Sequence, residues 1–379
     1  MVEYDKIDIP FSFGLIVYFL ILDFRSYNRN PSILDMKFLS NFKLTKMKDK
    51  IIKSKFYLLF IYIIVMVSCS EKADDISSNK NAYDIYICGK GFNGVGYWKN
   101  DIPVILDNQF ETVSSDIFLS AGDVYCASND YRKAYTVQYW KDKNSIFLDS
   151  NNFCRSSAIY VENSNVYVVG NFINRGKREA GYWKNSIKIP LQPVINNNSP
   201  ASLASDVIVH NGDVYITGGI SDKGAVYWKN GEAITLENND PTNSVAYKIF
   251  IDESDIYICG YIGNKAVYWK NGSLNYLSGG VNNTVAYSIF VKDSTIHLVG
   301  IEKDKSNMSK AVYWKNGKFQ YLSGSISTAE DIVIVDQDVY ITGDVVKANN
   351  DLKAVYWKNG VEHTLADVGY ATSILAIKK

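Results

Sequence analysis

The sequence predicts an all-β fold, a β-propeller of seven four-stranded antiparallel blades, on three observations. First, a Tyr-Trp-Lys unit recurs seven times at intervals of 41 to 45 residues, the mark of a repeated supersecondary unit. Second, each unit reads as four short strands rich in Val, Ile and Tyr. Third, the first unit of the repeat region lacks its first strand, and an extra strand follows the last unit. The recurring tryptophans, which are all the tryptophans of the chain, are Trp98, Trp140, Trp183, Trp228, Trp269, Trp314 and Trp357.

The strand pattern of one unit is clearest around Trp228. Strands are expected at residues 203–209, 213–218, 225–229 and 233–236, with Asn-Gly turns at 211–212 and 230–231. Asn-Gly between two strands is a strong hairpin signal, because both turn residues must take positive φ. A glycine also closes the second strand of every unit except the one that carries Ser128. The pattern therefore predicts four antiparallel strands per unit.

The two ends of the repeat region predict how the ring closes. The first unit starts with a second strand, 83–89, and no first strand precedes it. The chain continues beyond its last unit with 369–377, which matches first strands such as 245–251 and 285–291. We therefore expect the C-terminal strand to complete the first blade and to protect its open edges. Residues 82–379 are expected to form one seven-bladed domain.

The segment before the repeats predicts export and lipidation. Residues 47–68 read as a signal peptide, with a lysine-rich front, an apolar stretch and a small residue, Ser68, at the end. The run from Val65 to Cys69 resembles the cleavage box of bacterial lipoproteins, except that Met66 replaces the usual leucine. This resemblance implies that Cys69 becomes the lipidated first residue of the mature protein. An ordinary signal peptide with an incidental cysteine is the alternative.

Two flanking segments complete the expected organisation. Residues 1–46 lie outside the repeats and are interpreted as an upstream extension from a misplaced start codon. The alternative is a second membrane segment over 9–24, although that stretch is short and is broken by Pro10. Residues 69–81 begin acidic and polar and read as a tether. Such a tether is either a plain solvated linker or the kind that directs some lipoproteins to the outer face of the outer membrane, which is the location we expect.

Charge and cysteine content limit the functional classes. The chain has 40 basic and 40 acidic residues, so it lacks the electrostatic footprint of a nucleic-acid-binding protein. Cys88 and Cys259 occupy the same repeat position and are expected to be small buried fillers. No histidines stand at metal-ligand spacing, and no catalytic or phosphate-binding motif occurs. We predict no catalytic residue, no metal, no cofactor and a monomeric propeller.

The repeat also resembles known extracellular repeats. Four units carry Ala-Val-Tyr-Trp-Lys-Asn-Gly and three carry weaker copies. Over residues 82–379 this pattern is similar to HAF-type repeats of the form Ala-x-x-Trp-x-x-Gly with a following leucine, and more distantly to Kelch repeats. Most units here have one glycine where Kelch repeats have a pair, and the Tyr-Trp pair is adjacent. The resemblance implies a propeller outside the cytoplasm and assigns no catalytic residue.

Two features compete as the binding surface. The tryptophans could form a carbohydrate-stacking ring, but a residue present in every unit is better explained as a filler of the contact between blades. Loop length varies only after the second and fourth strands, and these loops emerge at the same end of a four-stranded meander. Variable loops on a rigid scaffold are where binding usually resides. Neutral drift of exposed loops is the alternative.

The variable face and the mouth of the central channel supply the candidate ligand-binding residues. The basic side chains in the loops are Arg132, Lys133, Arg175, Lys177, Arg178 and Lys223. Near the channel mouth, seven residues before a second strand, stand Asp116, Asp206, Lys248 and Asp331. These three carboxylates and one lysine could bind a cation or a polar ligand, or could simply hydrate the channel.

These features together predict a lipid-anchored, extracytoplasmic propeller that serves as a binding or interaction module. Its expected partners are the membrane, through the lipid on Cys69, and a glycan or protein ligand. Two alternatives stay open, because a fold does not fix a function. One is a polysaccharide-active enzyme with its site on the same face, and the other is a periplasmic scaffold for envelope assembly.

Overall fold

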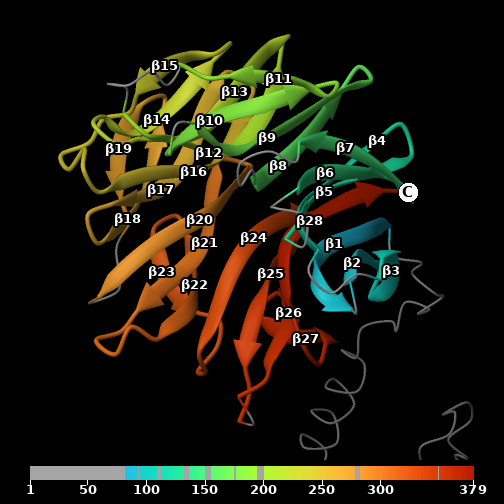
Figure 1. Cartoon of the computed structure of the whole chain (residues 1–379). Coiled ribbons are helices and arrows are strands. Elements are labelled where there is room, and N and C mark those ends of the chain that lie inside the picture. Colours follow the sequence, from blue (N-terminus) through green and yellow to red (C-terminus); the bar gives the residue numbers. More distant parts are fainter. Residues whose placement is uncertain are drawn as a thin grey trace, which may run out of the picture. The chain divides into compact units, whose positions relative to one another are not determined.

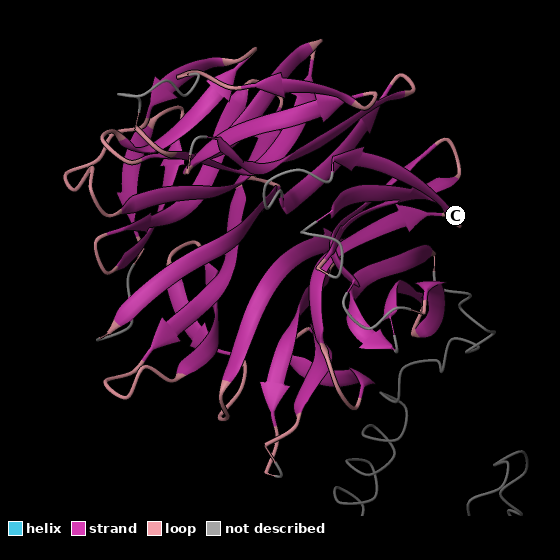
Figure 2. Ribbon diagram, viewed as in Figure 1, coloured by secondary structure: helices cyan, strands magenta, loops and turns pink. Residues whose placement is uncertain are grey.

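The described part of the chain consists of strands joined by turns and loops. The computed structural model describes residues 82–92, 94–108, 112–131, 136–149, 155–174, 176–193, 200–277, 282–348 and 350–379. These residues contain no helix (Figure 2). The described part of the chain therefore has no helix that is long and apolar enough to cross a membrane. Residues 80–379 form one compact unit. The expectations for 1–46, the signal peptide at 47–68, Cys69 and the tether at 69–81 fall outside the described residues.

Seven four-stranded antiparallel sheets form the blades, and each has the same strand order from first to fourth. The first strands of blades one to seven are β28 (Tyr370–Lys378), β4 (Thr112–Ser120), β8 (Arg155–Glu162), β12 (Ser202–His210), β16 (Ser244–Asp252), β20 (Asn283–Lys292) and β24 (Ser327–Val335). The second strands are β1 (Tyr83–Phe92), β5 (Asp123–Asp130), β9 (Asn165–Asn174), β13 (Asp213–Ile220), β17 (Asp255–Ile262), β21 (Thr295–Lys303) and β25 (Asp338–Val346).

The third and fourth strands complete each blade toward its outer edge. The third strands are β2 (Gly94–Lys99), β6 (Thr136–Lys141), β10 (Lys177–Lys184), β14 (Gly224–Lys229), β18 (Lys265–Lys270), β22 (Ser309–Lys315) and β26 (Leu352–Lys358). The fourth strands are β3 (Ile102–Asp107), β7 (Asn144–Asp149), β11 (Ile187–Pro190), β15 (Glu232–Thr235), β19 (Ser273–Tyr276), β23 (Lys318–Tyr321) and β27 (Val361–Ala366). The predicted fold of seven four-stranded blades is confirmed.

The first strands form a closed ring around the centre of the propeller (Figure 1). Each contacts the first strand of the next blade, and β28 contacts both β24 and β4. β28 also pairs antiparallel with β1, from Tyr83 opposite Lys378 to Lys90 opposite Tyr370. The prediction that the C-terminal strand completes the first blade is therefore confirmed. This closure covers the inner edge of β1, which would otherwise be unpaired.

The repeated tryptophans pack between blades. Trp228 of blade four has no exposed surface, and it belongs to one apolar cluster with Tyr182 and Leu191 from the preceding blade. The most exposed of the seven, Trp140, keeps only 8% of its surface. The indole N–H of Trp228 donates to the carbonyl of Gln192, so even its polar atom is used inside the structure. The tryptophans are interblade fillers, as predicted, and not a surface stacking ring.

The lysine and asparagine that follow each tryptophan hold the turns at the end of the propeller opposite the variable loops. Lys229 lies 2.8 Å from the carboxylate of Asp213 and 5.2 Å from the ring centre of Tyr215. Asn230 takes positive φ, and its side-chain oxygen accepts a hydrogen bond of 2.9 Å from the backbone N–H of Val214. Six other units place Asn or Asp at the same position with the same bond. The repeated motif is therefore explained by packing and turn geometry.

A β-bulge interrupts every first strand and explains the recurring glycine. In blade four, Ser205 is left unpaired between the pairs Ala204–Gly218 and Asp206–Thr217. The bulge brings the carbonyl of the first strand so close that a Cβ at Gly218 would lie 1.9 Å from it. Only glycine fits such an approach without a backbone shift. In every first strand, an alanine or serine pairs with the position that Gly218 occupies in blade four, and the residue after it lies in the bulge. We call these the bulge residues: Ser115, Ser157, Ser205, Tyr247, Tyr287, Glu330 and Thr372.

Candidate functional site

The variable loops lie together on one face of the propeller, here called the loop face. Backbone hydrogen bonds join a loop after a second strand to the loop that leads into the first strand of the same blade. The N–H of Ser221 donates to the carbonyl of Ala201 at 2.9 Å, and the N–H of Gly263 donates to that of Asn243 at 2.7 Å. The expectation that loops after second and fourth strands share one end is therefore confirmed. The opposite end, here called the turn face, carries the short turns.

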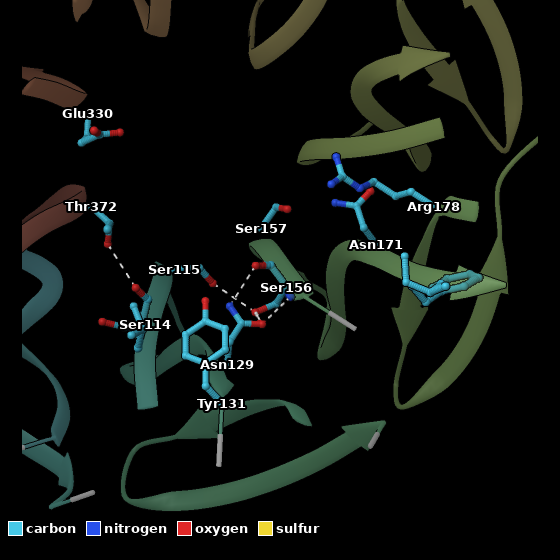
Figure 3. A pocket seen from close by; sticks show the side chains of 13 residues that line it. Ser114, Ser115, Asn129, Tyr131, Ser156, Ser157, Asn171, Arg178, Glu330 and Thr372 are labelled. Carbon is cyan, nitrogen blue, oxygen red and sulfur yellow. Dashed lines mark hydrogen bonds between the residues drawn. The ribbon is translucent and has the colours of Figure 1, made fainter. Parts of the chain in front are cut away.

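A cavity of about 540 Å³, here called the mouth cavity, opens on the loop face at the centre of the ring (Figure 3). Its walls come from blades one, two, three and seven. Four of the bulge residues line it, and the ends of β5 and β9 add two amide side chains. These six polar residues are Ser115, Ser157, Glu330, Thr372, Asn129 and Asn171. The volume falls within the range of about 300–1,000 Å³ typical of small-molecule sites.

A second cavity of about 460 Å³ adjoins the first across blades three to five. It shares Ile173 and Arg178 with the mouth cavity, so these two side chains stand between the two spaces. Pro241 and Tyr261 line its far part. The loop face therefore offers two neighbouring cavities with one basic side chain between them.

Three hydroxyl groups of the mouth cavity donate their hydrogen bonds to other groups of the protein. Ser115 donates to the carbonyl of Ala127 at 3.3 Å, and Ser157 donates to that of Ala204 at 3.1 Å. Thr372 donates to a carbonyl as well, that of Cys88 at 3.3 Å. A hydroxyl oxygen has two acceptor lone pairs besides its proton. These three partly exposed side chains therefore present hydrogen-bond acceptors to the cavity.

Two ionisable groups face the mouth cavity from opposite sides. Figure 3 shows Arg178 directed into the open space from one wall, with Glu330 on the other. The side chain of Arg178 is exposed, and its guanidinium has no hydrogen bond or ion pair with any described residue. Burial, reinforced by the nearby charge of Asp344, raises the pKa of Glu330 to about 7. Among the described residues, the guanidinium of Arg178 and the partly neutral carboxyl of Glu330 thus define the charge of this site.

Aromatic bulge residues continue the rim beside Glu330. The rings of Tyr247 and Tyr287 meet edge to face with centres 5.3 Å apart, and the ring centre of Tyr261 lies 6.0 Å from that of Tyr247. Burial raises the pKa of Tyr247 to about 12, with the charges of Tyr261 and Glu330 acting in the same direction. The rim is therefore acceptor-rich on one side and aromatic on the other.

The four charged residues expected near the channel mouth form a buried layer below the bulge residues. Asp331 accepts hydrogen bonds from Ser288 at 2.6 Å and Ser373 at 3.0 Å, and lies 3.6 Å from the Lys248 ammonium. Asp116 accepts from Ser373 at 2.6 Å, which links it to Asp331. These contacts join the first strands of blades two, five, six, seven and one.

Desolvation controls the protonation of this buried layer. It raises the pKa of Asp206 to about 6 and also raises that of Asp116, in both cases against the attraction of Lys248. Burial alone would lower the pKa of Lys248, but the negative charges of Asp331, Asp206 and Asp116 raise it above its ordinary value. Asp206 accepts a bond of 3.0 Å from the backbone N–H of Ile249 in the next blade. None of these four residues lines either cavity.

The basic loop residues fall into three groups. Arg132, Lys133 and Arg175 lie outside the described residues. Lys223 is exposed in the turn between β13 and β14, away from both cavities. Lys177 and Arg178 begin β10, and only Arg178 reaches the cavities. Among the described residues, no group of three or more His, Cys, Asp or Glu side chains could hold a metal ion.

Sequence reasoning missed the bulge residues. Four of the bulge residues directly precede the charged residues that the sequence analysis selected. The bulge places these two consecutive side chains at different depths in the channel. The available signal was the repeated glycine, because it marks where the first strand presses on the second.

The comparisons with known proteins find partial matches among solved structures. No protein-family model matches the chain, and no curated protein matches its sequence. Among solved structures, TolB from Acinetobacter baumannii matches with 12% identity and a TM-score of 0.43, over 62% of this chain and 62% of that chain. A nidogen/laminin complex matches with 8% identity and a TM-score of 0.41, over 77% and 98%. A puromycin-hydrolysing peptidase of Mycobacterium tuberculosis matches with 11% identity and a TM-score of 0.43, over 64% and 45%. These similarities assign neither a ligand nor an activity to this chain.

Proposed function

We propose that the protein is a binding module that engages its ligand at the mouth cavity of the loop face. The observation that carries this proposal is the position of Arg178, whose exposed guanidinium lies between two adjoining cavities and has no partner among the described residues. Convergent polar groups in a concave site are the usual signature of ligand binding. The turn face, in contrast, is occupied by structural hydrogen bonds of the repeated motif.

A comparison of two surface variants tests which face binds. The loop-face variant combines Tyr131→Ala and Arg178→Ala, two side chains that line the mouth cavity. The turn-face control combines Lys143→Ala and Gln337→Ala, which replace exposed side chains at the other end. The purified proteins are used to capture ligands from solubilised envelope fractions and on a glycan array. We expect the loop-face variant to lose ligands that the wild type and the turn-face variant retain. Equal capture by the two variants would refute the assignment.

We propose further that Cys69 carries a lipid anchor that holds the propeller at the outer membrane, facing outward. The order of basic front, apolar stretch, Ser68 and Cys69 supports this proposal. Mass spectrometry of the purified protein is expected to find an acylated peptide that begins at Cys69. An unmodified Cys69 within a longer chain would rule the anchor out, whereas accessibility to protease on whole cells tests the outward orientation.

A further inference from the structure

We propose that the mouth cavity binds an acidic sugar residue, with its carboxylate on Arg178 and its hydroxyl groups on Ser115, Ser157 and Thr372. The inference rests on the proposed function, because it names the ligand class of the same site. It is carried by the complementary placement of acceptors, guanidinium and apolar surface around one cavity of about 540 Å³.

The acceptor side of the cavity fits a ligand rich in hydroxyl groups. The three hydroxyl side chains donate to backbone carbonyls. The oxygens of Ser115 and Thr372 can each accept one hydrogen bond within the protein, from Ser156 and Cys88, so at least one lone pair on each hydroxyl oxygen is left for a donor from a ligand.

The amides of Asn129 and Asn171 are likewise held in place by paired bonds to a neighbouring first strand. Each amide oxygen accepts one of these paired bonds and one N–H donates the other, so each amide has an N–H donor left over. A fixed array of hydroxyl acceptors and amide donors matches the hydroxyl groups of a sugar, which both donate and accept. Because the array is already ordered in the free protein, a ligand does not have to immobilise it.

The charge of the cavity fits one negative group on that sugar. Among the residues that the structure describes, Arg178 is the one basic residue that lines the two cavities, and its guanidinium can hold a carboxylate through two parallel hydrogen bonds. A phosphate monoester would bring more charge than one guanidinium balances, with Glu330 on the opposite wall. The raised pKa of Glu330, about 7, keeps that carboxyl partly neutral near neutral pH, so its repulsion of a single carboxylate is reduced. A monoanionic carboxylate is therefore the better match.

Apolar surface completes the fit. Tyr131 and Ile173 line the same cavity, and their side chains can pack on the C–H face of a sugar ring. The second cavity continues past Ile173 and Arg178 toward Tyr261, so the next residue of a chain has a place to lie. The site is thus suited to the end of an acidic polysaccharide as well as to a free sugar acid.

Matched ligands and matched variants test the inference. The probes are galacturonic acid, its methyl ester, galactose, galactosamine and tri-galacturonic acid, measured by titration calorimetry with the full-length protein. The ester keeps the ring and removes only the charge. The variant Arg178→Gln removes the guanidinium at an exposed position, and Lys223→Gln is the control for charge on the same face outside both cavities. Thermal unfolding of each variant confirms that the propeller is intact.

We expect the acid to bind about 10- to 100-fold more tightly than its ester, the range expected for a charged hydrogen bond. Arg178→Gln should bring the acid down to the level of the ester and leave the ester unchanged, while Lys223→Gln changes neither. Tri-galacturonic acid binding at least as well as the monosaccharide favours a polysaccharide end as the ligand, and weaker binding favours a free sugar acid.

Any of four results would overturn the inference. Acid and ester could bind equally, Arg178→Gln could leave the affinity for the acid unchanged, or galactosamine could bind more tightly than the acid. No binding by any sugar would also overturn it. In that case the proposed function still stands if the loop-face variant fails to capture an envelope ligand that the turn-face control retains, so the two failures are distinguishable.

Discussion

Asp331 is expected to be the residue whose removal most weakens the ring of first strands. In Asp331→Ala the hydroxyl of Ser288 and the N–H of Ile374 lose their acceptor, and the Lys248 ammonium loses its nearest carboxylate. The hydroxyl of Ser373 keeps only its bond to Asp116. Breaking a buried charge pair from one side typically costs about 3–5 kcal/mol. Lys248 keeps 30% of its side chain exposed, so water can hydrate the remaining charge and the lower end, about 3 kcal/mol, applies. A typical total stability is about 5–15 kcal/mol.

The assay is urea unfolding followed by tryptophan fluorescence, which is suitable because the indoles are buried between blades. Asp331→Asn keeps one acceptor oxygen and should lose clearly less stability than Asp331→Ala. Asp206→Ala is the control, because it removes a carboxylate from the same layer that accepts one bond from the next blade. Equal destabilisation by Asp331→Ala and Asp206→Ala would refute the reasoning that Asp331 joins several blades.

Three further predictions follow from the same contacts. Trp228→Ala should lower the free energy of unfolding by about 3–5 kcal/mol, since the side chain is fully buried, and denaturant titration checks this. Deletion of residues 369–379 removes β28 and should yield aggregated or unfolded protein by gel filtration; a monomer with unchanged melting temperature would contradict the closure. Because burial raises the pKa of Asp206 to about 6, its contribution to stability is present below its ordinary pKa of 3.8 and is lost as the pH rises through 6. Asp206→Asn should therefore be more stable than wild type at pH 7, by up to about 3 kcal/mol, with the difference vanishing near pH 4; parallel pH profiles of the two proteins would contradict this.

The architecture was predictable because each of its determinants is local. The Tyr-Trp-Lys unit sets the period, Asn-Gly pairs set the turns, and the phase of the tail sets the closure at β28. These signals depend on backbone preference and on side-chain alternation, which a sequence displays directly.

The candidate site was only partly predictable because it depends on register. Arg178 was identified through the length of its loop, but Ser115, Ser157 and Glu330 were not. A bulge shifts the facing of side chains by one residue, and nothing in the alternation pattern fixes where it falls. Asp331 was selected as a residue of the channel mouth. In the structure it is buried and accepts a hydrogen bond from Ser288 of the neighbouring blade. The pairing of Asp116 and Asp331 through Ser373 depends on the closed geometry of the ring.

The pairing of β1 with β28 has a consequence for the order of events in folding. Tyr83 and Lys378 are partners across a sheet, yet they stand at opposite ends of the repeat region. Blades two to seven can each assemble from neighbouring segments as the chain is made, whereas blade one must wait for the last residues to arrive. Contacts between such distant positions are slow to form, and until they form the unpaired edge of β1 can make non-native pairings with other strands. The first β-strand of the propeller to be synthesised is thus among the last to gain its full set of neighbours.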